Sequence, residues 1–308
     1  MPASLRPRRS ALFVPGSNAR AIAKAKTVAA DVLIFDLEDS VATGHKESAR
    51  EAVATAVAEL TTGRREIVVR INGLDTPWVA RDIAAMVAVK PDALLLPKIE
   101  RTDDIRRARA ALAAAQAPKA LNLWVMIETP MAIINAAAIA AVAAMPAPSI
   151  TGFVIGTNDL TAEIGAPPRP GRAALLPHLS QALLAARAHN LAILDGTYND
   201  LDDRKGLRAE CQQGRDMGMD GKTVIHPSQV PIANDAFSPD AEELIWARRV
   251  VETFALPDNS GVEVMRLAGR MVERLHERAA RRMLELADAI AVMDQETKEK
   301  GKTRLTRG

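Results

Sequence analysis

The sequence has a single cysteine, almost no excess charge and no convincing membrane-spanning run. Cys211 cannot form a disulfide within the chain, and nothing in "AECQQGRD" would activate its thiol, so we expect a structural residue in a reducing compartment. Forty Lys and Arg residues nearly balance 38 Asp and Glu residues, for a formal charge of +2. That balance gives no general attraction to nucleic acid or anionic membranes, and we expect neither as a partner.

Two further absences concern location. The apolar stretch at residues 130–148 is dominated by alanine and bounded by proline, which favours a packed helix over a membrane span. The start of the chain lacks the apolar segment of a secretory signal. We therefore expect a cytoplasmic protein.

Several catalytic motifs are also missing. The sequence has no Ser-His-Asp order with a nucleophile elbow, no zinc-binding HExxH and no dinucleotide-binding glycine loop. "DMGMDGKT" (216–223) resembles the end of a phosphate-binding P-loop, but Asp216 stands where the first glycine is required, and the segment precedes a strand. His226, before a proline at a strand end, is either a base or a hydrogen-bonded structural residue.

What the sequence does contain is a repeated alternation of short apolar runs with Ala-rich helical segments. The eight runs lie at residues 10–16, 32–39, 67–72, 93–99, 123–129, 152–159, 191–196 and 222–227. Short apolar runs without alternation are typical of strands covered on both faces. Eight strand–helix units predict a (β/α)8 TIM barrel over residues 9–235. A doubly wound open sheet is the alternative, and the missing dinucleotide fingerprint makes it less favoured.

The chain continues beyond the eighth predicted strand. Residues 236–295 predict a C-terminal helical extension, with helices at 238–255 and 276–293 and a short hairpin at 262–273. This segment is too small for an independent core, so we expect it to pack on the barrel or on a neighbouring subunit. The basic segments 1–8 and 296–308 are expected to be flexible tails.

Polar side chains collect where the predicted strands end. Active sites of (β/α)8 barrels lie at the C-terminal ends of the strands. These ends carry Asp36, Glu38, Asp39, Arg70, Asn72, Lys98, Glu100, Glu128, Asn158, Asp159, Asp195 and His226. A cation at this mouth would neutralise the gathered acids.

The composition of this set favours a hard cation. Carboxylates without cysteine, and with at most one histidine, favour Mg²⁺ first and Mn²⁺ second, and disfavour Zn²⁺. Glu128 and Asp159 end consecutive strands, so both can reach one ion. The alternative is that each acid stabilises the N-terminus of the following helix. Arg70 and Lys98 do not fit that alternative.

Arg70, in "VVRIN", has two interpretations. It either pairs with Asp36, Glu38 or Asp39, or forms a bidentate clamp on a substrate carboxylate or a developing oxyanion. The two are compatible.

Seven segments in one order resemble a known family: "RSALFVPGSNARAIAKA", "DVLIFDLEDSVA", "VVRINGLDTPW", "LLLPKIE", "VMIETP", "GTNDLT" and "DGKTVIHPSQV". The resemblance is to the β subunit of citrate lyase and its stand-alone relatives, the malyl-CoA and citramalyl-CoA lyases of the HpcH/HpaI aldolase superfamily. It spans roughly residues 9–290.

This resemblance implies a Mg²⁺-dependent barrel that makes or breaks a carbon–carbon bond beside a thioester carbonyl. On this basis Glu128 and Asp159 hold the metal, Glu128 also helps to bind the substrate, and Arg70 binds the keto-acid half. An outer shell around the metal-bound waters and Arg70 would consist of Asp36, Glu38 and Asp39.

The resemblance also implies partners. CoA phosphates are expected near Arg20 and Lys24, on the helix after "FVPGSN", although such basic residues are often only solvated. Members of this family are usually homotrimers or hexamers in which the C-terminal segment reaches over a neighbouring barrel.

One segment departs from the family pattern. Many relatives carry an acid/base aspartate in a "DGxMVDxP"-like hairpin supplied by the adjacent subunit. In "LAGRMVERLHERA", Glu273 occupies the place of that aspartate, while Ala268 and Leu275 replace the turn Asp and the Pro. Either Glu273 performs the proton transfer, or it is a surface residue and the acid/base lies elsewhere.

Five functions remain to be separated. The leading hypothesis is a CoA-ester lyase that cleaves or forms a carbon–carbon bond in a malyl-CoA, citramalyl-CoA or citryl-CoA-type thioester. The alternatives are a malyl-CoA-type thioesterase with the same metal site, a CoA-independent aldolase, and a citrate lyase β subunit that depends on a carrier protein. The last is an inactive barrel that only binds ligand, which the intact Arg70, Glu128 and Asp159 disfavour.

Overall fold

The computed structural model describes residues 6–60, 63–144 and 148–305. It divides into two compact units, one formed by residues 8–237 and the other containing the chain from residue 238 onward.

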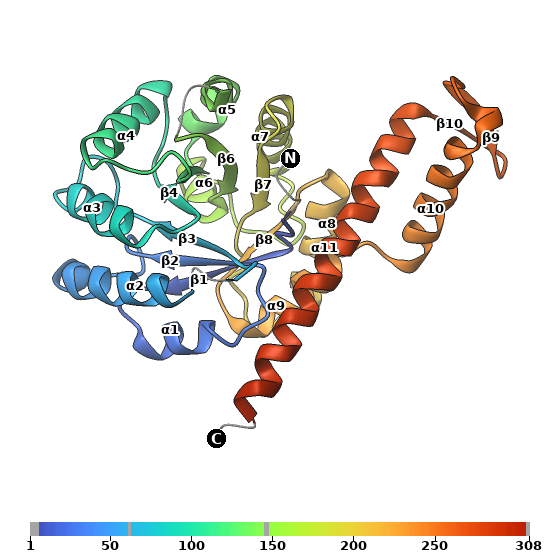
Figure 1. Cartoon of the computed structure of the whole chain (residues 1–308). Coiled ribbons are helices and arrows are strands. Elements are labelled where there is room, and N and C mark those ends of the chain that lie inside the picture. The colour runs from blue at the N-terminus through green and yellow to red at the C-terminus, as the bar shows by residue number, and fades with distance from the viewer. Residues whose placement is uncertain (1–5, 61–62, 145–147, 306–308) are drawn as a thin grey trace. The chain divides into compact units, whose positions relative to one another are not determined.

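The first unit is a closed barrel of parallel strands (Figure 1). Its strands are β1 (Ser10–Pro15), β2 (Val32–Asp36), β3 (Glu66–Arg70), β4 (Ala93–Leu96), β5 (Asn122–Ile127), β6 (Ile150–Ile155), β7 (Ala192–Asp195) and β8 (Gly221–Val224). Each strand pairs with the next in sequence, and β8 returns to β1 with Lys222 opposite Ser10. The predicted (β/α)8 barrel is therefore confirmed, and the doubly wound open sheet is excluded.

Helices follow the strands and surround them (Figure 1). They are α1 (Ala19–Ala25), α2 (Lys46–Leu60), α3 (Val79–Val89), α4 (Thr102–Ala114), α5 (Pro130–Ala141), α6 (Thr157–Glu163), α7 (Leu176–Ala188), α8 (Arg204–Met217) and α9 (Val230–Ala236). Helix α5 shows how the sequence sets a boundary. Thr129 accepts a hydrogen bond from the backbone N–H of Ala132 at 3.1 Å, and Pro130 takes the first helical position.

The strands bury side chains on both faces, which explains their unbroken apolar runs. In β2, Val32 and Ile34 belong to the core inside the barrel, whereas Leu33 and Phe35 belong to the layer between strands and helices. Trp124 belongs to the inner core and is the largest of the fully buried side chains. The packed barrel leaves its strand ends as the natural place for a site.

Residues 130–141 of the alanine-rich stretch form a packed helix, as expected, and residues 145–147 lie outside the described residues. Residues Ala132, Ala136, Ile139 and Ala140 of α5 are buried in the outer layer of the core. Among the described residues, no helix has the length and apolar character needed to cross a membrane.

The second unit contains α10 (Ala241–Ala255), β9 (Val264–Leu267), β10 (Arg270–Glu273) and α11 (Arg274–Leu305). Strands β9 and β10 form an antiparallel hairpin, which confirms the predicted hairpin. The two helices and the hairpin share a small core made by Ala247, Val250, Phe254, Leu267, Val272 and Ala280.

The two predicted tails are only partly described. Helix α11 continues to Leu305, so residues 296–305, which we expected in a flexible tail, are helical. At the other end, Arg8 is held by Glu66, with its Nε 2.6 Å from Oε2. The remainder of the predicted tails, residues 1–5 and 306–308, lies outside the described residues.

Candidate active site

The barrel brings four of the predicted site residues to one mouth. Asp36 and Arg70 are the last residues of β2 and β3, Glu128 follows β5, and Asp159 lies in the first turn of α6 after β6. Because parallel strands of a closed barrel end on the same side, these side chains meet there. Asp159 is also placed to interact with the dipole of α6, but Asp36 and Glu128 cap no helix.

Arg70 is held rigidly by Asp36. Its Nε and Nη2 donate to the two carboxylate oxygens of Asp36, both at 2.7 Å, and its guanidinium lies 5.0 Å from the centre of the Phe13 ring. Asp36 also accepts from the backbone N–H groups of Glu38 and Ser40. Burial alone would raise the pKa of Asp36, but Arg70 outweighs it and the pKa is lowered. The predicted ion pair is confirmed.

Glu38 and Asp39 complete the acidic surroundings of Arg70. Glu38 Oε2 lies 2.9 Å from Arg70 Nη1 without hydrogen-bond geometry, and Asp39 Oδ2 lies 3.5 Å away with its side chain 61% exposed. Burial raises the pKa of Glu38 to about 7, because Arg70 opposes it only in part and Asp39 and Glu128 add to the rise. At neutral pH Glu38 is therefore protonated part of the time.

Lys46 supports this acidic segment and was missed from the sequence. Its Nζ donates to the backbone carbonyls of Leu37 and Glu38 at 2.9 and 2.8 Å, and lies 5.3 Å from the ring centre of Trp78. A lysine at the first position of a helix opposes the helix dipole, which was the available signal.

Glu128 is fully buried, and only one of its two carboxylate oxygens has a hydrogen-bond partner among the described residues. Its Oε1 accepts the backbone N–H of Lys98 at 2.7 Å, whereas Oε2 has no hydrogen-bond partner within the described part of the chain. Burial raises the pKa of Glu128, with Lys98 acting against the rise. A Cβ on Gly156 would come within 2.4 Å of Glu128 Cβ and 2.8 Å of Oε2, so only glycine leaves room for this carboxylate.

The carboxylates of Glu128 and Asp159 converge on one point, which is occupied by the ammonium group of Lys98. Lys98 Nζ forms an ion pair with Asp159 and lies 3.8 Å from Glu128 Oε1. Burial lowers the pKa of Lys98, but the two carboxylates outweigh it and the pKa is raised. The strand ends therefore present two acids that can share a single cation.

These donors fit magnesium. Across residues 6–60, 63–144 and 148–305 there is no group of three or more His, Cys, Asp or Glu side chains arranged for a metal ion. Mg²⁺ needs only one or two protein carboxylates and fills its other positions with water and substrate oxygens. The buried, unpartnered Oε2 of Glu128 would gain a partner from such an ion.

Several other predicted residues are structural or stay untested. His226 Nδ1 lies 2.7 Å from Ser228 Oγ in a turn, which fits the structural interpretation. Arg20 and Lys24 are exposed on α1. Glu273 ends β10 in the second unit, where its backbone N–H donates to His276 Nδ1 at 2.9 Å. The proposed roles of Arg20, Lys24 and Glu273 remain predictions.

The strand-end residue Asp195 belongs to a buried charge cluster that the sequence did not reveal. The fully buried Lys222 Nζ lies 3.0 Å from Asp195 and 2.7 Å from Glu210, and Arg172 Nη1 lies 2.6 Å from Asp195. The two negative and two positive charges of this cluster neutralise each other. Their ion pairs link β7, β8, α8 and the loop before α7. Nearby Cys211 is buried, and burial raises the pKa of its thiol to about 12, as expected for a structural cysteine.

A hollow of about 470 Å³ adjoins the candidate metal site. Its lining includes Glu38, Asp39, Lys46, Asn72, Trp78 and Lys98. Asn72 is fixed there by Asp82, which accepts from its side-chain amide at 2.6 Å. Substrate groups bound in this hollow would meet both charged and aromatic side chains.

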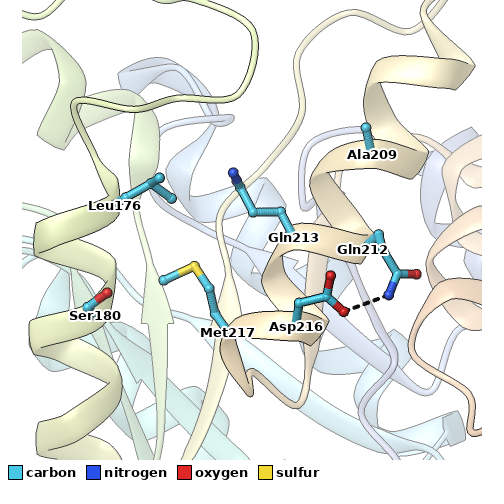
Figure 2. Close-up of a pocket in the computed structure, with 7 residues that line it drawn as sticks. All are labelled: Leu176, Ser180, Ala209, Gln212, Gln213, Asp216 and Met217. Atoms are coloured by element: carbon cyan, nitrogen blue, oxygen red, sulfur yellow. Dashed lines mark hydrogen bonds between the residues drawn. The ribbon is translucent and has the colours of Figure 1, made fainter.

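A second hollow, between α7 and α8, is chemically poorer (Figure 2). Its lining residues are Leu176, Ser180, Ala209, Gln212, Gln213, Asp216 and Met217. The carboxylate of Asp216 already accepts from Gln212 Nε2 at 2.8 Å. Asp216 and Met217 end α8, and β8 begins at Gly221, so the segment that resembles a P-loop runs from helix to strand, as the sequence indicated. The barrel mouth is the stronger candidate.

Comparisons with known proteins agree with this fold. The (3S)-malyl-CoA thioesterase of Cereibacter sphaeroides (strain ATCC 17029 / ATH 2.4.9) is 47% identical over 285 residues, covering 92% of this chain and 96% of that protein. The citrate lyase subunit beta of Leuconostoc mesenteroides subsp. cremoris is 32% identical over 294 residues, covering 94% and 96%.

A solved structure extends the comparison. Protein CitE from Mycobacterium tuberculosis, in complex with magnesium, acetoacetate and coenzyme A, is 34% identical with a TM-score of 0.71, covering 92% of this chain and all of that one. The family profile described as HpcH/HpaI aldolase/citrate lyase matches residues 9–227, which is more than half of the chain. The chain therefore belongs to the HpcH/HpaI aldolase/citrate lyase family.

Proposed function

We propose that this protein is a Mg²⁺-dependent enzyme acting on CoA thioesters of the malyl type, with Glu128 and Asp159 as the metal ligands. The convergence of these two carboxylates on one point carries the proposal. The solved relative contains magnesium, a keto acid and coenzyme A, the three groups that such a site would take. When bound, Mg²⁺ supplies a Lewis acid that polarises substrate oxygens.

Arg70 is the residue placed to bind the substrate's carboxylate. Asp36 fixes the orientation of the Arg70 guanidinium, and Arg70 Nη1 faces Glu38 and Asp39. Since the pKa of Glu38 is about 7, protonation of Glu38 leaves Arg70 less neutralised and more attractive to an incoming anion. The same positive charge would offset negative charge that develops on the substrate.

Hydrolysis of the thioester becomes the first candidate reaction. The sequence alone placed carbon–carbon cleavage first. The 47% identity to a malyl-CoA thioesterase, against 32% to a citrate lyase subunit, supports the reverse order. Carbon–carbon cleavage remains the second candidate because lyases are found in the same family.

An assay with two readouts tests the reaction. Malyl-CoA, citramalyl-CoA, methylmalyl-CoA and citryl-CoA are each incubated with Mg²⁺ or with EDTA, and free thiol and keto acid are measured. Free thiol with the hydroxy acid intact indicates a thioesterase, and keto acid without thiol indicates a lyase. Mg²⁺-dependent loss of none of the four thioesters would contradict the proposal.

The metal ligands are tested by Glu128→Gln and Asp159→Asn. Each variant removes one anionic oxygen and should lower Mg²⁺-dependent activity at least ~100-fold while keeping the circular dichroism spectrum. Glu163→Gln is the matched control, because Glu163 is an exposed acid on the same helix as Asp159. Full activity of either ligand variant at ordinary Mg²⁺ concentrations would contradict the assignment.

We also propose that the active form is a homo-oligomer in which Glu273 from one chain serves the site of another. This proposal rests on the family resemblance and on the absence of Glu273 from the barrel unit.

A further inference from the structure

Lys98 bridges the two proposed metal ligands by two separate routes. Its backbone N–H donates to Glu128 Oε1 at 2.7 Å, and its Nζ lies 3.8 Å from the same oxygen while pairing with Asp159. The backbone bond orients Glu128 so that Oε2 stays unpartnered. One residue therefore both aims a carboxylate and supplies the cation beside it.

This arrangement requires an uncommon backbone conformation. Lys98 has φ 52°, in the left-handed region that costs a residue with a side chain roughly 1 kcal/mol or more. Lys90 has a similar φ of 54°, but it ends α3, where such a conformation is ordinary. Lys98 ends no helix. In this conformation its backbone N–H reaches Glu128 and its Nζ reaches Asp159.

We propose that Lys98 is a built-in counter-ion that competes with Mg²⁺ for Glu128 and Asp159 and so sets the affinity of the site for metal. The inference rests on the proposed function, because it takes these two acids as the metal ligands. Two carboxylates facing one point repel each other, and a single ammonium beside them relieves that repulsion. A divalent ion must displace the ammonium before it binds both acids.

The displaced side chain has suitable surroundings. Lys98 also lines the 470 Å³ hollow at the mouth, together with Asp39 and Asp104. Its side chain is 39% exposed, so moving it breaks no tightly packed core. A short movement of the side chain would keep its positive charge beside this hollow.

The test compares Lys98→Met with Lys98→Arg, and uses Lys90→Met as the matched control for losing a lysine at positive φ. Mn²⁺ is the probe, and its dissociation constant is read from the EPR signal of the free ion. Lys98→Met should bind Mn²⁺ about 3- to 5-fold more tightly than the wild type, the upper part of the range expected for losing one partly exposed ion pair. Lys98→Arg and Lys90→Met should stay within about twofold of the wild type.

Thermal unfolding separates competition from a merely structural role. In EDTA, Lys98→Met should unfold at a lower temperature than the wild type, and saturating Mg²⁺ should close that gap. An equal loss with and without Mg²⁺ would mean that Lys98 only stabilises the fold, and it would overturn the proposal.

The two proposals fail in different ways. If the wild type binds Mn²⁺, Glu128→Gln does not, and Lys98→Met matches the wild type, the metal site stands and the role of Lys98 is refuted. If neither the wild type nor any variant binds Mn²⁺, both are refuted.

Discussion

Glu38 is a residue of the barrel mouth whose charge changes near neutral pH. Its pKa is about 7 in the folded protein, against an ordinary value near 4.5. The folded state therefore holds a proton that the unfolded chain releases between these values, and stability falls as pH rises from about 4.5 to about 7. Above neutral pH, the ionised Glu38 carboxylate therefore lowers the free energy of unfolding.

Glu38→Gln removes the ionisable group and keeps a side chain of nearly the same size and shape. The variant should match the wild type near pH 4.5 and become relatively more stable as pH rises to 8, by up to ~3 kcal/mol in the free energy of unfolding. Urea unfolding at several pH values measures the difference. A difference that does not vary with pH would show that the charge of Glu38 carries no penalty.

Gly156 is the residue that makes room for the Glu128 carboxylate. In Gly156→Ala the new Cβ would lie 2.4 Å from Glu128 Cβ, so the carboxylate must move. We expect at least a ~10-fold loss of Mg²⁺-dependent activity and a loss of about 1–3 kcal/mol in stability. Gly44→Ala is the control, since nothing lies within 4 Å of its Cβ position. Equal activity of the two variants would contradict the role given to Gly156.

The sequence predicts the charged residues of the site better than it predicts the contacts that hold them in place. Arg70, Glu128 and Asp159 were found because they follow buried apolar runs, and strand ends of a barrel meet at one mouth. The contact of Gly156 with Glu128 depends on how neighbouring strands are aligned, which no local pattern encodes. The left-handed conformation of Lys98 also escaped prediction, because its backbone contact is with Glu128, 30 residues further along the chain.

At the scale of elements, the predicted strands extend beyond the residues at which the observed strands end. The run at residues 32–39 was predicted as one strand, but β2 ends at Asp36. Asp36 accepts from the backbone N–H groups of Glu38 and Ser40, which turns the chain out of the sheet. Strand order was predicted correctly because consecutive strand–helix units pair with their neighbours.

The β9–β10 hairpin turns through two residues at positive φ, Ala268 at 48° and Gly269 at 83°. Such a turn favours Asn or Gly at the first position, and alanine is strained there. Ala268→Asn should therefore slow hydrogen exchange of the hairpin amides and raise the stability of the second unit by roughly 1 kcal/mol. Ala268→Val should act in the opposite direction. Equal exchange in both variants would count against strain at this turn.

At the scale of the whole molecule, the role of Glu273 can be tested by mixing inactive chains. Glu273→Ala and Arg70→Ala should each be inactive alone. If Glu273 acts on a neighbouring chain, mixed oligomers contain some sites with both residues intact, and up to about a quarter of the wild-type activity should return. Subunit exchange is verified by mass spectrometry of differently tagged chains. No recovery despite proven exchange would assign the proton transfer to another residue.

The way the barrel closes has a consequence for the newly made chain. Strand β8 pairs with β1 across about 210 residues of sequence, so the sheet cannot close until residues 221–224 have left the ribosome. Until then β1 and the last strand made both present unpaired backbone edges, which are templates for aggregation. Strands β5 and β6, which precede Glu128 and Asp159, are synthesised well before that moment. The interval before β8 emerges is therefore when this chain most depends on protection by chaperones, and slow translation across residues 160–220 would prolong it.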